Sequence, residues 1–70
     1  MARIYQLMIQ GEQRCGDIYY NEADAEDKAI QIVVDVKNPR WRSVMIWSAE
    51  EIDGVHIDAL DWTPGKIIWA

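Results

Sequence analysis

Few residues in this 70-residue sequence have the types and spacing that catalysis or metal binding requires. His56 is the single histidine and Cys15 the single cysteine, whereas a zinc site draws several such ligands together. His56 alternates with Asp58 and would share one face of a strand with it. A nucleophile–base pair of Cys15 and His56 would have to arise through folding, because nothing local supports it. We therefore expect no metal and no cofactor.

The acidic pairs and the glycines indicate no catalytic motif either. Glu50 with Glu51, or Asp58 with Asp61, could be paired carboxylates for acid–base chemistry, but 12 of the 70 residues are acidic and such pairs are common here. The four glycines, at positions 11, 16, 54 and 65, each stand in a turn context and form no phosphate-binding loop. The sequence predicts a protein that acts by binding and not an enzyme.

One short segment has the pattern of a nucleic-acid contact. In Arg40-Trp41-Arg42 the indole ring could stack on a base between two phosphate contacts. A formal charge of −5 and a pI near 4.5 oppose this interpretation, because nucleic-acid-binding domains usually carry excess positive charge. We expect no direct contact with nucleic acid, and a minor nucleic-acid-binding role stays as an alternative.

Charge is distributed unevenly along the chain. Residues 21–38 and residues 50–70 each carry five acids, against two lysines and one lysine respectively. A small basic collar of Lys37, Arg40 and Arg42 begins at the end of the first segment and continues beyond it. A solvated acidic face that keeps a small protein soluble is one interpretation. The other is a surface that meets a basic groove on a partner by electrostatic complementarity.

Length and composition indicate one small soluble domain over residues 1–70. Half of the residues are hydrophobic and 27% are charged, which is typical of a globular chain. A lone cysteine cannot form an internal disulfide, and small secreted domains usually carry several. The first residues do not have the pattern of a signal peptide, and no apolar run approaches the roughly 20 residues of a membrane span. We expect a cytoplasmic protein.

The segment from Asn21 to Asn38 is predicted to be the one long helix. The rest of the chain is predicted to form a sheet that this helix covers. Asn21 is the expected N-cap, and Asn38-Pro39 ends the helix because proline disfavours helical geometry in the preceding residue. The β-branched run from Ile30 to Val34 opposes a helix and disfavours its last turn. The apolar stripe has a period of 3.6 residues and comprises Ala25, Ala29, Ile32, Val33 and Val36.

Alternating patterns predict the strands on either side of this helix. The expected strands are residues 3–10, 17–20, 41–49 and 55–60, with a possible fifth at 66–69 after a turn at residues 63–65. Asp53-Gly54 would form the hairpin turn before residues 55–60. Alternatively, Ser48 and Glu51 form a capping box, and residues 49–53 are a short helix ended by Gly54.

The predicted architecture is α+β, an antiparallel sheet of four to five short strands in the order ββαββ with one helix packed on one face. The helix covers the face with Tyr5, Leu7 and Ile9. The other face carries Ile4, Met8, Met45 and Trp47, with Tyr19 or Tyr20 beside them. Either the C-terminal strand folds across this face, or it is an interface with a partner or with a second copy.

These observations favour a small acidic protein-binding module. Its most concrete form is an inhibitor of the type that phages and mobile elements encode, such as anti-CRISPR or anti-restriction proteins, docking on a basic nucleic-acid-binding surface of a larger complex. The alternative is a self-associating module, a homodimer that buries the open sheet face. Acids would steer the partner and a tryptophan would anchor it. The expected partner-binding residues are Trp47, Glu50, Glu51, Asp53, Asp58, Asp61 and Trp62.

Overall fold

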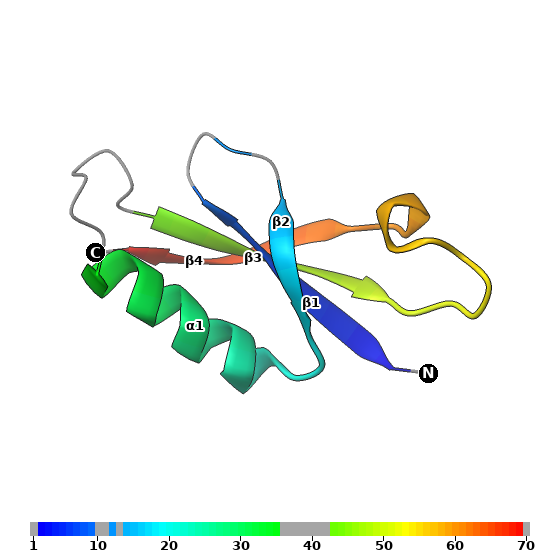
Figure 1. Ribbon diagram of the computed structural model, residues 1–70, viewed down its shortest axis with the longest axis horizontal. Helices are drawn as coiled ribbons and strands as arrows, with labels where there is room; N and C mark the ends of the chain where they lie inside the picture. Colours follow the sequence, from blue (N-terminus) through cyan, green and yellow to red (C-terminus); the bar gives the residue numbers. More distant parts are fainter. Residues whose placement is uncertain (1, 10–11, 13, 36–42, 70) are drawn as a thin grey trace.

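The computed structural model describes residues 2–9, 12, 14–35 and 43–69. In this part of the chain one helix packs against a four-stranded antiparallel sheet with the strand order β2-β1-β3-β4 (Figure 1). The α+β class and the order ββαββ expected from the sequence are confirmed. The elements are β1 (Arg3–Ile9), β2 (Cys15–Tyr19), α1 (Glu22–Asp35), β3 (Ser43–Glu50), the 3₁₀ helix η1 (Ile57–Ala59) and β4 (Thr63–Trp69).

Helix α1 begins where the sequence predicts it. The Asn21 side-chain oxygen accepts a hydrogen bond from the backbone N–H of Asp24 at 2.8 Å, and the Asn21 amide donates back to the Asp24 carboxylate at 2.8 Å. This reciprocal pair satisfies a free amide of the first turn. The expected stop at Asn38-Pro39 lies outside the described residues.

The buried stripe of the helix also agrees with the expected one. Ala25, Ala29 and Val33 are buried and Ile32 is half-buried, whereas Ile30 and Val34 are exposed. Val36 lies outside the described residues. The β-branched run lies inside α1, which extends to Asp35. Packing of the stripe therefore outweighs the low helix propensity of this run.

Strand register places the expected residues under the helix. Leu7 pairs with Ile46 and Ile9 pairs with Val44, and all four pack in the cluster that contains the helix stripe. Tyr19 belongs to this helix-covered face and not to the opposite one, and Tyr20 is exposed. The placement of Tyr19 beside Met8 and Met45 is therefore corrected.

The expected connection between β3 and β4 is wrong in both of its forms. Strand β3 continues through Glu50, so residues 49–53 form no helix, and residues 55–60 form no strand. A turn does lie at Asp53-Gly54, where the Val55 N–H donates to the Ile52 carbonyl at 3.2 Å and Gly54 has a φ of +80°. Only Gly54 has positive φ, as in a type II turn, whereas the two-residue hairpin turn requires it at both central positions.

Residues 63–65 are also not a turn, because they open β4. Proline is tolerated there since β4 is an edge strand of the described sheet. A side chain at Gly65 would approach the Ile46 carbonyl to 3.0 Å, next to an irregularity in the β3–β4 register. β4 is thus the fourth strand, and the described residues contain no fifth.

The sheet face opposite the helix is covered differently from the expectation. The C-terminal strand does not fold across it but pairs beside β3. Instead, residues 51–62, hereafter the 51–62 loop, cover part of this face, because Leu60 packs with Ile4 and Ala49 in a second buried cluster. The rest of the face carries the cross-strand row Met8, Met45 and Ile67.

Candidate functional site

Most of the predicted partner-binding residues lie in or beside the 51–62 loop. This loop forms one end of the molecule, away from α1, and is drawn in yellow to orange at the right of Figure 1. Its start is held to the N-terminal segment by the hydrogen bond from the Glu51 N–H to the Ala2 carbonyl at 2.9 Å. The structure therefore brings Glu51, Asp53, Asp58, Asp61 and Trp62 onto one element.

Arg14 fixes this loop to the sheet. Its guanidinium donates to the buried Gln6 side-chain oxygen at 2.8 Å, while the Gln6 amide donates to the Gly16 carbonyl at 2.9 Å. The same guanidinium lies 3.6 Å from a carboxylate oxygen of Asp58. The Arg14 side chain is only 17% exposed. It links a buried amide on β1 to an exposed acid of the loop.

Trp62 is the second attachment of the loop. Its indole N–H donates to the Ile57 carbonyl at 2.7 Å, and the Arg14 guanidinium carbon lies 4.2 Å from its ring centroid. The half-buried ring packs against the cluster of Ile4, Ala49 and Leu60. In the free protein, Trp62 therefore holds the loop in place, and this leaves less of the ring to anchor a partner.

His56 and Asp58 come together, but not on a strand. His56 caps η1, and its Nδ1 accepts a hydrogen bond from the Asp58 N–H at 3.2 Å. Nδ1 can accept this bond only when it carries no proton. While the bond is formed, the 3.7 Å approach of Nδ1 to the Asp58 carboxylate is therefore not an ion pair. The pair stabilises the local turn of the loop.

Four carboxylates at this end of the molecule point into solvent. They have no hydrogen bond or ion pair with any side chain in the described part of the chain, in contrast to Asp58, which faces Arg14. All four are exposed. They are Glu50, Glu51, Asp53 and Asp61.

Trp47 lies on β3, on the sheet face opposite the helix. It pairs with Gln6 of β1 on one side and with Pro64 of β4 on the other. The residue is half-buried, and its indole Nε1 is enclosed without a hydrogen-bond partner. A buried donor without an acceptor costs free energy, and because Nε1 is enclosed, a partner could reach it only after neighbouring side chains move.

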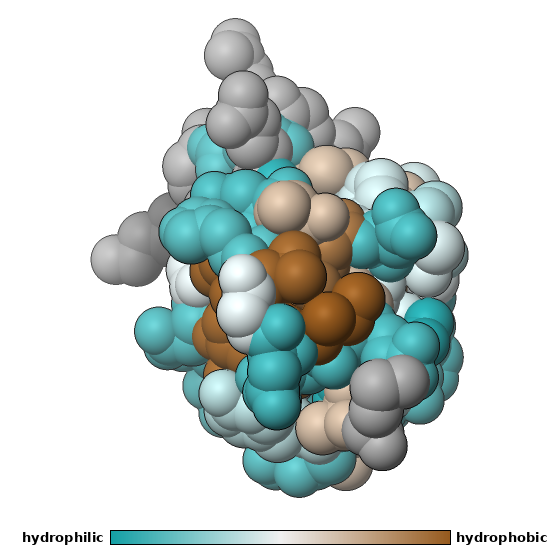
Figure 2. Space-filling view, turned by 90° about the vertical axis from the view of Figure 1, so that its right-hand side faces the viewer, coloured by the Kyte–Doolittle hydropathy of each residue, from teal (hydrophilic) through white to brown (hydrophobic). Residues whose placement is uncertain are grey.

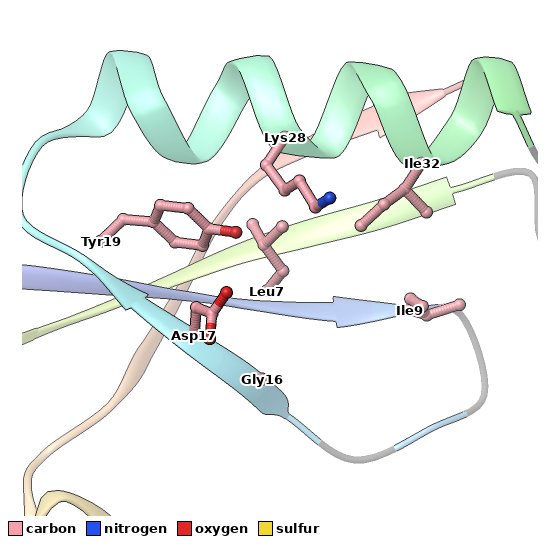
Figure 3. Close-up of a pocket in the computed structure, with 7 residues that line it drawn as sticks. All are labelled: Leu7, Ile9, Gly16, Asp17, Tyr19, Lys28 and Ile32. Carbon is pink, nitrogen blue, oxygen red and sulfur yellow. The ribbon is translucent and has the colours of Figure 1, made fainter.

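A groove of about 220 Å³ opens on the other side of the sheet, between α1 and β2 (Figure 3). Leu7, Ile9 and Ile32 form its apolar floor and wall, and Lys28 and Asp17 lie at its margin. Burial raises the pKa of the Tyr19 phenol, and the nearby Asp17 carboxylate raises it further. Among the described residues, no hydrogen bond joins the polar groups of this groove, and most of its lining is apolar.

The remaining candidate residues contribute no assembled site. No group of three or more potential metal ligands occurs among the described residues. Residues 37 and 40–42, which include the basic collar and Arg40-Trp41-Arg42, lie outside the described residues, and the side chain of Cys15 is not described. No described helix is long and apolar enough to cross a membrane.

Sequence reasoning missed two sets of residues. Arg14 and Gln6 lie in different elements, and nothing in the alternating pattern of β1 indicates that a buried glutamine receives an arginine. The alternating pattern predicts a strand over Val55 and Ile57 and assigns no role to Ile52, yet all three are exposed on the loop. A signal was present, since Ile52 and Ile57 each have an acidic neighbour in the sequence and Gly54 indicates a turn between them.

No protein family, curated protein or solved structure matches this chain. The function must therefore be argued from the residues themselves.

Proposed function

We propose that this chain is a small acidic protein-binding module that docks on a basic surface of a larger protein or nucleoprotein complex. The observation that carries the proposal is the group of four exposed carboxylates at one end of the molecule, Glu50, Glu51, Asp53 and Asp61. None of them forms an ion pair with a described side chain, although Arg3 lies opposite Glu50 in the β1–β3 register. A basic partner would supply the missing ion pairs.

The location of these acids supports a role in recognition. A network in which Arg14 contacts Gln6, Asp58 and Trp62 holds the loop that carries them. A loop fixed in this way loses little conformational entropy when it binds, which favours affinity. Like charges concentrated on one surface also speed encounter with an oppositely charged partner.

The most concrete form of this function is inhibition. A protein with the acidic loop described here can occupy the basic groove through which a larger complex holds nucleic acid. Anti-CRISPR and anti-restriction proteins, encoded by phages and mobile elements, are the class that acts in this way. Small size and acidity support this form of the proposal, and the cytoplasm is where such a partner would be met.

The test begins with affinity purification from the native host and identification of the co-eluting protein. Surface-plasmon kinetics then compare the wild type with Glu51→Gln, Asp53→Asn and Asp61→Asn, with folding checked by circular dichroism. Each loop substitution should slow association, and the loss should shrink at high salt. Trp47→Ala should speed dissociation if its indole meets a partner.

Glu22→Gln at the start of α1 is the matched control for charge. It removes one exposed acid from the other acidic end of the chain and should leave association unchanged. If association were slowed in this variant alone, the interface would lie at the start of the helix and not at the loop. Association rates that do not change with salt would contradict the basic partner.

A second candidate function is self-association through the open part of the sheet. Trp69 is 65% exposed and Ile67 is 39% exposed, and Ile67 continues the row of Met8 and Met45. A homodimer would bury this row. Sedimentation equilibrium of the wild type against Ile67→Ser and Trp69→Ser tests this candidate, because both substitutions should convert a dimer into a monomer.

A further inference from the structure

We infer that the 51–62 loop carries a composite docking surface, with an aliphatic centre of Ile52, Val55 and Ile57 and a rim of carboxylates, and that it binds a basic protein surface that presents an apolar side chain. The inference rests on the proposed function and deepens it. It assigns the anchoring contact to three aliphatic residues in place of the tryptophans.

The aliphatic centre is exposed although its backbone is fixed. Ile52 is 47% exposed, Val55 39% and Ile57 37%. The hydrogen bond between the Val55 N–H and the Ile52 carbonyl closes a turn, which holds these two residues within about 7 Å of each other. The Ile57 carbonyl accepts from the Trp62 indole and from the Leu60 N–H, so its backbone is fixed to the loop as well.

Figure 2 faces the end of the molecule at which this loop lies. Apolar side chains gather in the middle of this face, and polar residues surround them. Soluble monomers expose scattered aliphatic residues, but a group of them with a polar border is typical of an interaction site. Interfaces commonly have this composition, with an apolar centre and a polar rim.

The acids of the rim are the sequence neighbours of the aliphatic residues. Glu51 precedes Ile52, Asp53 follows it, and Asp58 follows Ile57. Of these, only Asp58 faces a cation among the described side chains, namely Arg14. An apolar side chain flanked by lysine or arginine would fill the centre and neutralise the rim at the same time.

The charge of the rim also selects among the possible occupants. A second copy meeting this surface symmetrically would place Glu51 and Asp53 against the same acids of its partner, which costs free energy. A nucleic acid or an anionic lipid surface would be repelled for the same reason. A basic protein surface is the occupant that the charges favour.

A displayed library of random peptides supplies a defined probe. Selection uses wild-type protein, and the affinity of each enriched peptide is then measured for three proteins. These are the wild type, the double variant Ile52→Ser/Val55→Ser, and the double variant Ile30→Ser/Val34→Ser. The last is the matched control, because it removes one exposed isoleucine and one exposed valine from α1, outside the loop.

The enriched peptides should combine lysine or arginine with an apolar residue. Their affinity should fall roughly tenfold or more in the loop variant and stay within about twofold in the helix variant. Equal losses in both variants, or no peptide that prefers the wild type over the loop variant, would overturn the docking surface. Circular dichroism and thermal melts verify that both variants are folded.

Failure of the surface and failure of the proposed function give different results. Peptides that lose affinity with Glu51→Gln or Asp53→Asn and with salt, but not with Ile52→Ser/Val55→Ser, would retain the basic partner and overturn the aliphatic centre. Enriched peptides without basic residues, bound equally at low and high salt, would overturn the basic partner and with it the proposed function. If the wild type were a dimer and Ile52→Ser/Val55→Ser a monomer, the occupant of the surface would be a second copy, and the choice of a basic partner would be overturned.

Discussion

The guanidinium of Arg14 lies over the indole ring of Trp62, with its central carbon 4.2 Å from the ring centroid. This contact joins the segment that enters β2 to the last residue of the 51–62 loop. It also closes the network that runs from the buried Gln6 to the exposed Asp58. A cation over an aromatic face is favourable, more so where water is partly excluded. The proposed docking surface therefore depends on a contact between two residues that lie 48 positions apart.

The first prediction concerns Trp62. Truncation to alanine removes the ring from the cluster of Ile4 and Leu60, the bond to the Ile57 carbonyl and the platform for Arg14. Trp62→Ala should lower the free energy of unfolding by about 2–3 kcal/mol, which is below the range for a fully buried tryptophan because the ring is half-buried. Urea denaturation measures the loss.

Trp69→Ala is the control for the loss of a tryptophan, because Trp69 is largely exposed on the edge strand β4. It should cost less than about 1 kcal/mol. Trp62→Phe keeps a ring but loses the N–H donor, so it should fall between the two alanine variants. Equal destabilisation by Trp62→Ala and Trp69→Ala would contradict a structural role for Trp62.

The second prediction tests the buried stripe of α1 with two neighbouring valines. Val33 is 7% exposed and Val34 is 74% exposed. Val33→Asp would bury an unpaired charge and should cost several kcal/mol, enough to unfold a domain of this size. Val34→Asp adds the same charge in solvent and should change stability by about 1 kcal/mol or less. Thermal melts that gave the two variants the same midpoint would contradict the orientation of the helix.

The helix and three of the strands were predictable because their patterns are local. The stripe Ala25, Ala29 and Val33 repeats at the helical period, and Asn21 is a strong capping residue at its start. Alternation in β1 places Leu7 and Ile9 on the correct face. In each case the residues that decide the structure are close together in the sequence.

The connection after β3 was not predictable in the same way. Residues 55–60 alternate as a strand does, but Leu60 packs on Ile4 and Ala49, and β4 is the strand that pairs with β3. Arg14 and Gln6, which hold this loop, come from other elements. The candidate site was therefore only partly predictable, since its acids are visible in the sequence and its supporting contacts are tertiary.

The third prediction concerns the ion pair between β4 and α1. The Lys66 ammonium donates to the Glu26 carboxylate at 2.9 Å. This hydrogen bond raises the pKa of Lys66, and the charges of Glu26 and Glu22 raise it further. Glu26→Gln should therefore lower the midpoint of the Lys66 titration, measured from the chemical shift of its Cε carbon. Asp27→Asn removes another helix acid and should leave that midpoint nearly unchanged.

The sign of the accompanying effect on stability follows from linkage. Because the folded state holds the Lys66 proton more tightly than the unfolded state, the contribution of the pair is complete below the ordinary lysine pKa. It is lost as the pH rises through the raised value. The wild type should thus lose stability at alkaline pH slightly more than Glu26→Gln. The opposite order would contradict this pairing in solution.

The last prediction separates protein binding from nucleic-acid binding. Arg40-Trp41-Arg42 lie outside the described residues, so the test rests on charge alone. At a formal net charge of −5, the wild type should retain no DNA or RNA on a filter at physiological salt. Binding at micromolar concentration or tighter would reverse the ranking of the two functions. In that event the double variant Arg40→Gln/Arg42→Gln decides whether this segment is responsible. Loss of two phosphate contacts should weaken binding and reduce the slope of its salt dependence by roughly two.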